Sequence, residues 1–156
     1  MNSPRVQQRK VWLPVVDASG KPLEGDVLDE IDDEYRAVED NGDLTSAMIS
    51  RIKNRGETLD YGRTLLNMVK MAKSPRSGMS FDEMESVYPI IQKLKHRPVG
   101  GHILVDEAEF KIICEKVKLP FVTGYNELFH SFVKDILASQ KVALIEEAPN
   151  SACNTG

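Results

Sequence analysis

Residues 101–118 read GHILVDEAEFKIICEKVK, and this stretch predicts a strand followed directly by a helix. The run HILV is apolar and too short for a helix, which indicates a strand. Asp106 then stands three residues before Glu109, the spacing of an N-terminal capping box. From Phe110 onward, apolar residues recur at helical spacing. The stretch therefore predicts a strand joined to an amphipathic helix.

A second extended segment, KVWLPVVDASGKPL, offers this strand a partner. Valines and a tryptophan over residues 11–16 favour a strand, and we expect HILV to pair with it. Pro14 lacks a backbone N–H, so the segment should be an edge strand or the end of a strand. The following DASGKP gathers Asp, Ser, Gly and Pro, which indicates a turn.

Helical patterns account for most of the remaining chain. Gly42 is expected to end one helix, and Asp43 to cap the next. Ser80 precedes Glu83 as a second capping box, and Pro89 should kink or split the helix that follows. The expected helices cover 26–39, 44–54, 59–73, a segment from Ser80, a segment from Asp106, and 126–140. The predicted class is mainly α with a small N-terminal β element (α+β), with about five helices and a short β-hairpin or two-stranded sheet.

The chain has the size and composition of one globular domain. Its 156 residues are 41% apolar and 28% charged. We expect one domain over 1–145, in which the acidic segment 24–43 is either ordered or mobile, and a disordered polar tail at 146–156. No apolar run approaches the roughly 20 residues of a membrane span, and the N-terminus lacks the apolar core of a secretion signal. We expect no disulfide between Cys114 and Cys153, and an intracellular, cytoplasmic setting.

Charge is strongly segregated along the sequence. Residues 24–43 hold ten acids against one arginine, whereas residues 44–97 hold ten bases against five acids. The acidic stretch VLDEIDDEYRAVEDNGD, at 27–43, also carries an apolar stripe at helical spacing. It lacks the central glycine and alternating acids of a calcium loop, so we expect no metal site. It is a solvated helix face or flexible segment, or a surface that docks on a basic partner.

No catalytic signature is present in the sequence. His96, His102 and His130 lack the spacing of a helical zinc motif. The glycine pair of RPVGGHILV precedes its strand, which is the wrong order for a phosphate-binding loop, and no GxSxG occurs. We therefore expect no catalytic residue, no metal and no cofactor.

Basic residues cluster near the ends of three predicted helices, in RIKNR, KMAKSPR and KLKHR. Lysine and arginine are common at helix C-termini because they complement the helix dipole. Alternatively, the clusters form a patch that holds phosphates. This predicts a nucleic-acid-binding regulator or packaging factor that uses Arg51, Lys53, Arg55, Lys93, Lys95 and Arg97.

The order of segments resembles small structural and accessory proteins of tailed bacteriophages. The resemblance covers about residues 60–140: the helix SGMSFDEMESVYPIIQKLKH with its GM-x-x-x-EM pattern, a short strand, then the acid-capped DEAEF helix. It implies a phage-encoded protein that acts by contact with other proteins, in virion assembly or host takeover, in the host cytoplasm or the virion. It implies no active site.

We therefore expect a non-enzymatic interaction protein. Its partner is a protein with a basic surface, or a second copy of the chain, and no membrane is involved. The residues expected to meet that partner are Asp29, Asp32, Asp33 and Glu34. Nucleic-acid binding through the basic clusters is the alternative.

Overall fold

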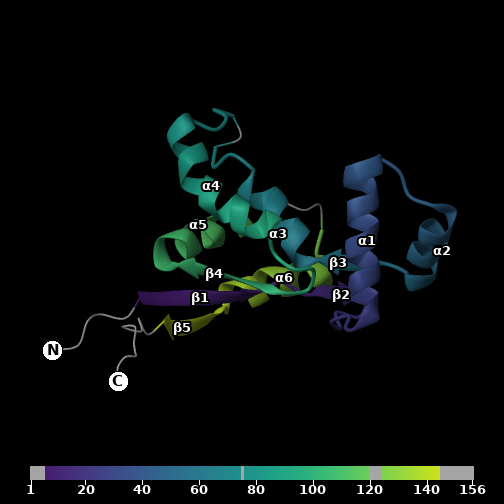
Figure 1. Cartoon of the computed structure of the whole chain (residues 1–156). Coiled ribbons are helices and arrows are strands. Elements are labelled where there is room, and N and C mark those ends of the chain that lie inside the picture. Colours follow the sequence, from purple (N-terminus) through teal and green to yellow (C-terminus); the bar gives the residue numbers. More distant parts are fainter. Residues whose placement is uncertain (1–5, 75, 120–123, 145–156) are drawn as a thin grey trace, which may run out of the picture.

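The structure is a computed structural model that describes residues 6–74, 76–119 and 124–144. In these residues the chain forms six α-helices, one three-stranded sheet and one two-stranded sheet (Figure 1). The predicted class, mainly α with a small β element that includes the N-terminal strand, is confirmed. The tail predicted at 146–156, with Cys153, lies outside the described residues.

The three-stranded sheet is antiparallel and has the N-terminal strand at its centre. Strand β1 (Val6–Trp12) pairs with β4 (His102–Asp106) on one side and with β5 (Gln140–Leu144) on the other. Val11 lies opposite Ile103, so the predicted pairing of HILV is confirmed. β1 is a central strand that ends before Pro14, which places the proline where the ladder needs no hydrogen-bond donor.

The two-stranded sheet joins β2 (Val15–Asp17) to β3 (Thr58–Asp60). The predicted turn follows β2, and the Asp17 carboxylate fixes it by accepting hydrogen bonds from the backbone N–H groups of Ser19 and Lys21. The helix expected from residue 59 begins only after β3, because Asp60 caps it. The sheet therefore carries the chain from the core to the next two helices and back.

Helices α1 (Asp26–Asn41) and α2 (Ser46–Arg55) lie between these two strands in the sequence. Gly42 ends α1 in the left-handed conformation, with φ of 72°, as predicted. The cap of α2 differs from the prediction. Thr45, and not Asp43, accepts the hydrogen bond from the backbone N–H of Met48.

Side-chain caps open the other four helices, α3 (Tyr61–Val69), α4 (Phe81–Lys95), α5 (Glu107–Val117) and α6 (Glu127–Leu137). The capping box of Asp106 and Glu109 is complete. At α4 only half of the predicted box forms, since Ser80 accepts from the Glu83 N–H but the Glu83 carboxylate bonds elsewhere. Pro89 lies inside α4 without dividing it.

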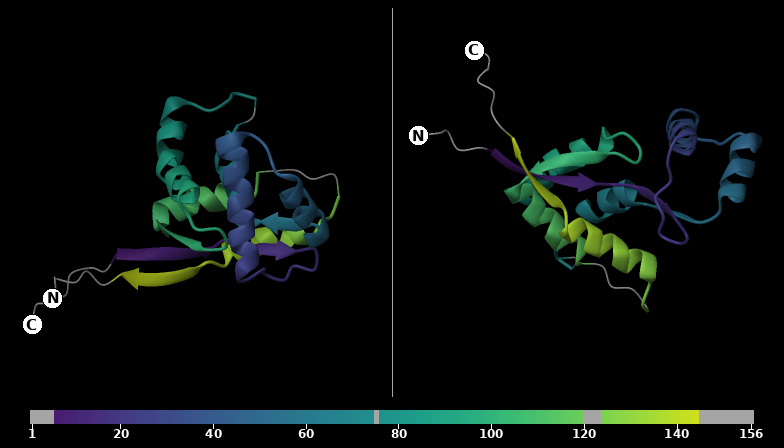
Figure 2. Two further views of the ribbon diagram at one scale, coloured as in Figure 1. Left: turned by 45° about the vertical axis from the view of Figure 1, so that its right-hand side comes forward. Right: turned by 90° about the horizontal axis from the view of Figure 1, so that it is seen from below.

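The hydrophobic core lies between the three-stranded sheet and helices α3, α4, α5 and α6. Fully buried side chains come from every one of these layers, among them Val11, Leu65, Ile90, Ile113 and Phe132. Helices α1 and α2 contribute nothing to this cluster and lie together beyond the β2–β3 sheet (Figure 2). In the described residues, no helix is both long enough and apolar enough to cross a lipid bilayer.

Candidate functional site around helix α1

Helix α1 has three faces with different surroundings. At about 100° per residue, Glu30 and Glu34 share one face, and Leu28 and Tyr35 lie on another. The third face carries four exposed aspartates, named here the outer acidic row: Asp26, Asp29, Asp33 and Asp40. The acidic segment is thus one helix with two inward faces and one solvated face.

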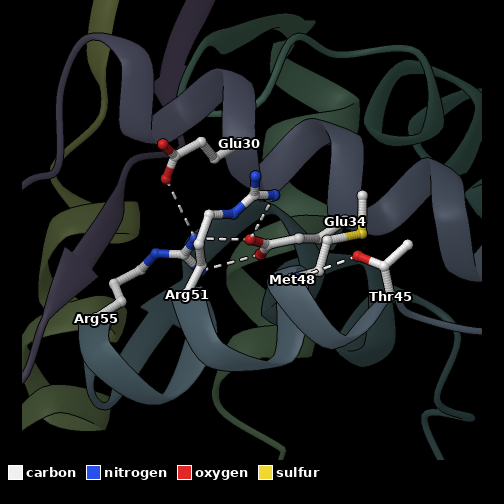
Figure 3. A network of polar contacts seen from close by, with 6 residues as sticks. All are labelled: Glu30, Glu34, Thr45, Met48, Arg51 and Arg55. Carbon is white, nitrogen blue, oxygen red and sulfur yellow. Dashed lines mark hydrogen bonds and ion pairs between the residues drawn. The ribbon is translucent and has the colours of Figure 1, made fainter.

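Two arginines of α2 hold the buried carboxylate of Glu34 (Figure 3). Arg55 makes a two-pronged contact, from Nη1 to Oε1 at 3.0 Å and from Nη2 to Oε2 at 2.7 Å. Arg51 Nη2 adds a bond to Oε2 at 3.3 Å, and Arg55 Nη2 lies 3.7 Å from the carboxylate of Glu30. The planar guanidinium matches a carboxylate in this geometry. The contacts account for the docking of α2 on α1.

The Glu34 carboxyl remains charged in this setting. Burial on its own would raise its pKa, because burial disfavours the ionised form. The hydrogen bonds and positive charges of Arg55 and Arg51 outweigh burial and hold the pKa of Glu34 below its ordinary value. In turn, the hydrogen bond to Glu34 raises the pKa of Arg55. The contact is therefore an ion pair at neutral pH.

The four acids expected to meet a partner separate in the structure. Asp29 and Asp33 are exposed, and Asp32 is partly exposed and pairs with Arg36 at 3.1 Å. Glu34 corrects the expectation, since it is only 5% exposed. Its arginine partners lie 17 and 21 residues along the chain, beyond the reach of a local helical pattern.

The six basic residues of the nucleic-acid alternative do not form one open patch. Arg51 and Arg55 are committed to Glu34. The other four divide between two bound and two open side chains. Lys93 pairs with Glu109 at 2.7 Å and Arg97 with Asp60 at 3.4 Å, whereas Lys53 and Lys95 are exposed and make no ion pair within the described part of the chain. Arg55 and Arg97 also approach α1 from different faces, so the acidic helix stands between the two clusters.

A chain of polar contacts ties α1 to α3 and to the end of α4. The Tyr35 hydroxyl donates to Asp60 Oδ2 at 2.6 Å, and Arg97 Nη2 lies 3.4 Å from both oxygens of that carboxylate. Asp60 also accepts from the backbone N–H of Gly62 at 2.9 Å. The Arg63 guanidinium stacks on the Tyr35 ring, 4.3 Å from its centroid. Burial and the neighbouring Asp60 charge raise the pKa of Tyr35, which keeps its proton for this bond.

Sequence patterns do not reveal this chain of contacts. Only one part of it has a local signal. Asp60 stands immediately before an apolar helical pattern, where aspartate is a favoured N-cap. The helical periodicity places Tyr35 only in the apolar stripe of α1, and its hydroxyl finds a partner 25 residues away.

A groove of about 750 Å³ opens beside this chain, between α1, α3 and the end of α4. Its wall on α1 includes Asp32 and Glu39, while α3 and α4 supply mostly basic side chains. The lining residues are Asp32, Tyr35, Arg36, Glu39, Arg63, Leu66, Asn67, Lys70, Lys95, His96, Arg97 and Val99. Five lysines and arginines face two acids, which gives the groove an excess of positive charge.

A second hollow, of about 740 Å³, lies beside β1, β4 and the end of α6. Trp12 lines it, is 55% exposed, and donates from Nε1 to the Gly100 carbonyl at 3.3 Å. Tyr61 donates to Asp135 at 2.6 Å, and burial together with that carboxylate raises the pKa of Tyr61. This hydrogen bond joins α3 to α6, so both groups have a structural role in the hollow.

The three histidines lie apart. His96 follows α4, His102 begins β4, and His130 lies on α6, and all three are exposed. Within residues 6–74, 76–119 and 124–144, no three histidine, cysteine, aspartate or glutamate side chains gather in a way that could hold a metal ion.

Comparison with protein families, with curated proteins and with solved structures found no match to the chain.

Proposed function

We propose that the protein acts by binding another protein, not by catalysis, and that the outer acidic row of α1 is its contact surface. The partner is a protein with a basic surface, or a second copy of the chain. The observation that carries the proposal is the division of the α1 acids. Glu30 and Glu34 are neutralised by α2, whereas Asp29 and Asp33 remain exposed.

Charge of one sign on a rigid helix face suits recognition of a basic surface. Complementary potentials steer encounter and fix the orientation of two proteins. Asp26, Asp29, Asp33 and Asp40 fall within about 60° around the α1 axis at the helical repeat, and none makes an ion pair among the described residues. Docking of α2 through Arg51 and Arg55 holds the helix and so presents the row as one surface.

The biological setting follows from the phage resemblance. We place the protein among phage-encoded factors that assist virion assembly or redirect a host machine, in the host cytoplasm or in the virion. Such factors work by contact, which agrees with a charged helix face as the active surface.

The nucleic-acid alternative has weaker support. Phosphate binding needs lysines and arginines whose charge is not already neutralised. Of the six residues expected for that role, Arg51, Arg55, Lys93 and Arg97 pair with carboxylates of the same chain. Lys53 and Lys95 remain, and they lie on different helices.

The test compares two charge-reversed variants with the wild type. Asp29→Lys/Asp33→Lys changes the outer acidic row, and Glu57→Lys/Glu85→Lys makes the same change in charge at exposed acids elsewhere. Each purified protein is immobilised and offered bacterial extract at about 50 and 200 mM salt, where screening of exposed charges differs. Sedimentation of each variant measures self-association in parallel.

We expect one or more proteins, or a second copy, to bind the wild type and Glu57→Lys/Glu85→Lys at low salt but not Asp29→Lys/Asp33→Lys. Equal binding by both variants would show that the row is not the contact surface. An absence of both partner and self-association at low salt would contradict the proposal as a whole.

A further inference from the structure

The groove between α1, α3 and α4 contains three cations whose charge is not neutralised within the described residues. Arg63 and Lys70 come from α3 and the cap that follows it, and Lys95 is the last residue of α4. All three are exposed and line the groove, and none makes an ion pair there. The other two cations of the lining are satisfied, Arg36 by Asp32 and Arg97 by Asp60.

Arg63 is held in place before any ligand arrives. Its guanidinium stacks on Tyr35, and Tyr35 is fixed by its hydroxyl bond to Asp60. Asp60 is fixed in turn by Arg97 and by the first turn of α3. Stacking leaves the edge of a guanidinium free, and this edge is a rigid fork of N–H donors that matches phosphate oxygens.

We propose that this groove is a binding site for a compact polyphosphate, with Arg63, Lys70 and Lys95 as the phosphate contacts. The volume of about 750 Å³ is within the range of small-molecule sites. Leu66 and Val99 add an apolar portion to the lining, which suits the non-phosphate part of such a ligand.

The acids around the groove favour a compact ligand over nucleic acid. Asp32 and Glu39 form part of the α1 wall, and the outer acidic row lies on the neighbouring face of the same helix. A long polyanion would have to pass these carboxylates and be repelled by them. The lining also offers no free aromatic ring for a base, since Tyr35 is already covered by Arg63.

The experiment measures binding of inorganic tripolyphosphate by titration calorimetry at about 50 mM salt, where screening is weak. The groove variant is Arg63→Ala/Lys70→Ala/Lys95→Ala. The matched control is Lys21→Ala/Lys53→Ala/Lys111→Ala, which removes three exposed lysines outside the groove. Circular dichroism checks that each variant is folded. A single-stranded and a double-stranded DNA oligonucleotide, at equal phosphate concentration, form the second arm.

We expect tripolyphosphate to bind the wild type and the control. In the groove variant, removal of each charge-assisted hydrogen bond should weaken binding roughly tenfold. Arg63→Lys should weaken binding by an intermediate amount, because lysine keeps the charge but has no fork of donors. DNA should bind more weakly than tripolyphosphate. Absence of tripolyphosphate binding, or an equal weakening in the control, would overturn the site. Tighter binding of DNA through the same residues would overturn its assignment to a compact ligand.

Discussion

Gly62→Ala is a direct test of the polar chain that joins α1 to α3 and α4. Gly62 is buried in the first turn of α3, and the guanidinium of Arg97 lies against it. A Cβ atom at this position would lie 1.9 Å from Arg97 Nε and 2.4 Å from Cζ. The backbone of Gly62 does not have positive φ, so alanine can adopt it. The side chain of Arg97 must therefore move.

Two effects of opposite sign set the change in stability. Alanine is the better helix former, by up to about 1 kcal/mol. Moving Arg97 breaks its contact with Asp60 and its Nη1 bond to the Leu94 carbonyl, which is 2.7 Å long. Hydrogen bonds of charged groups contribute about 1.5–3 kcal/mol. Asp60 keeps its bonds from Tyr35 and from the backbone, so no buried charge is left alone. The net result should be a destabilisation of about 1–2 kcal/mol.

Urea denaturation of a double-mutant cycle measures this effect. The four proteins are the wild type, Gly62→Ala, Arg97→Ala and the double variant. Without the Arg97 side chain, the new methyl group has nothing to displace, so Gly62→Ala should be neutral or stabilising in that background. The two substitutions should therefore couple by about 2 kcal/mol. The same effect of Gly62→Ala in both backgrounds, or stabilisation of the wild type, would refute the reasoning.

Two further predictions concern α1 and α2. The pKa of Glu34 is lowered in the folded protein, so its stabilising contribution is complete above its unfolded pKa and disappears as pH falls through the folded value. Urea midpoints of the wild type should therefore fall on acidification below pH 4.5, the ordinary pKa, and those of Glu34→Gln should fall less. Thr45→Ala should cost about 1 kcal/mol in the same assay because it removes the cap of α2. Asp43→Ala should cost little, and equal costs would contradict the assigned cap.

Sequence patterns predict features whose partners lie within a few residues. The box of Asp106 and Glu109 is complete in the structure, because both of its hydrogen bonds span three residues. Gly42 ends α1 for a similarly local reason. The β1–β4 pairing is also accessible from the sequence, since two short apolar runs in a mainly helical chain have few other strands to join.

Features that depend on distant partners could not be predicted in this way. Strand β5, Gln140–Leu144, follows directly after α6, and helical periodicity alone assigns its first residue to the end of that helix. It becomes a strand because β1 offers it a free edge, with Val6 opposite Leu144. Glu34 is a parallel case among the site residues. In the sequence it is one more acid on a solvated face, and only the fold brings two arginines to it.

The charge segregation of the chain therefore has two separate consequences. Part of it is neutralised internally, where Arg51 and Arg55 meet Glu34, and this fixes α2 on α1. The remainder stays on neighbouring faces of α1, as the outer acidic row and as the groove. If both surfaces bind ligands, they must be coupled. A polyphosphate in the groove adds negative charge beside the row and should strengthen binding of a basic partner. Thermodynamic linkage then requires the partner to strengthen polyphosphate binding by the same factor. Since the screening length is about 8 Å at physiological salt, this coupling should weaken as salt rises.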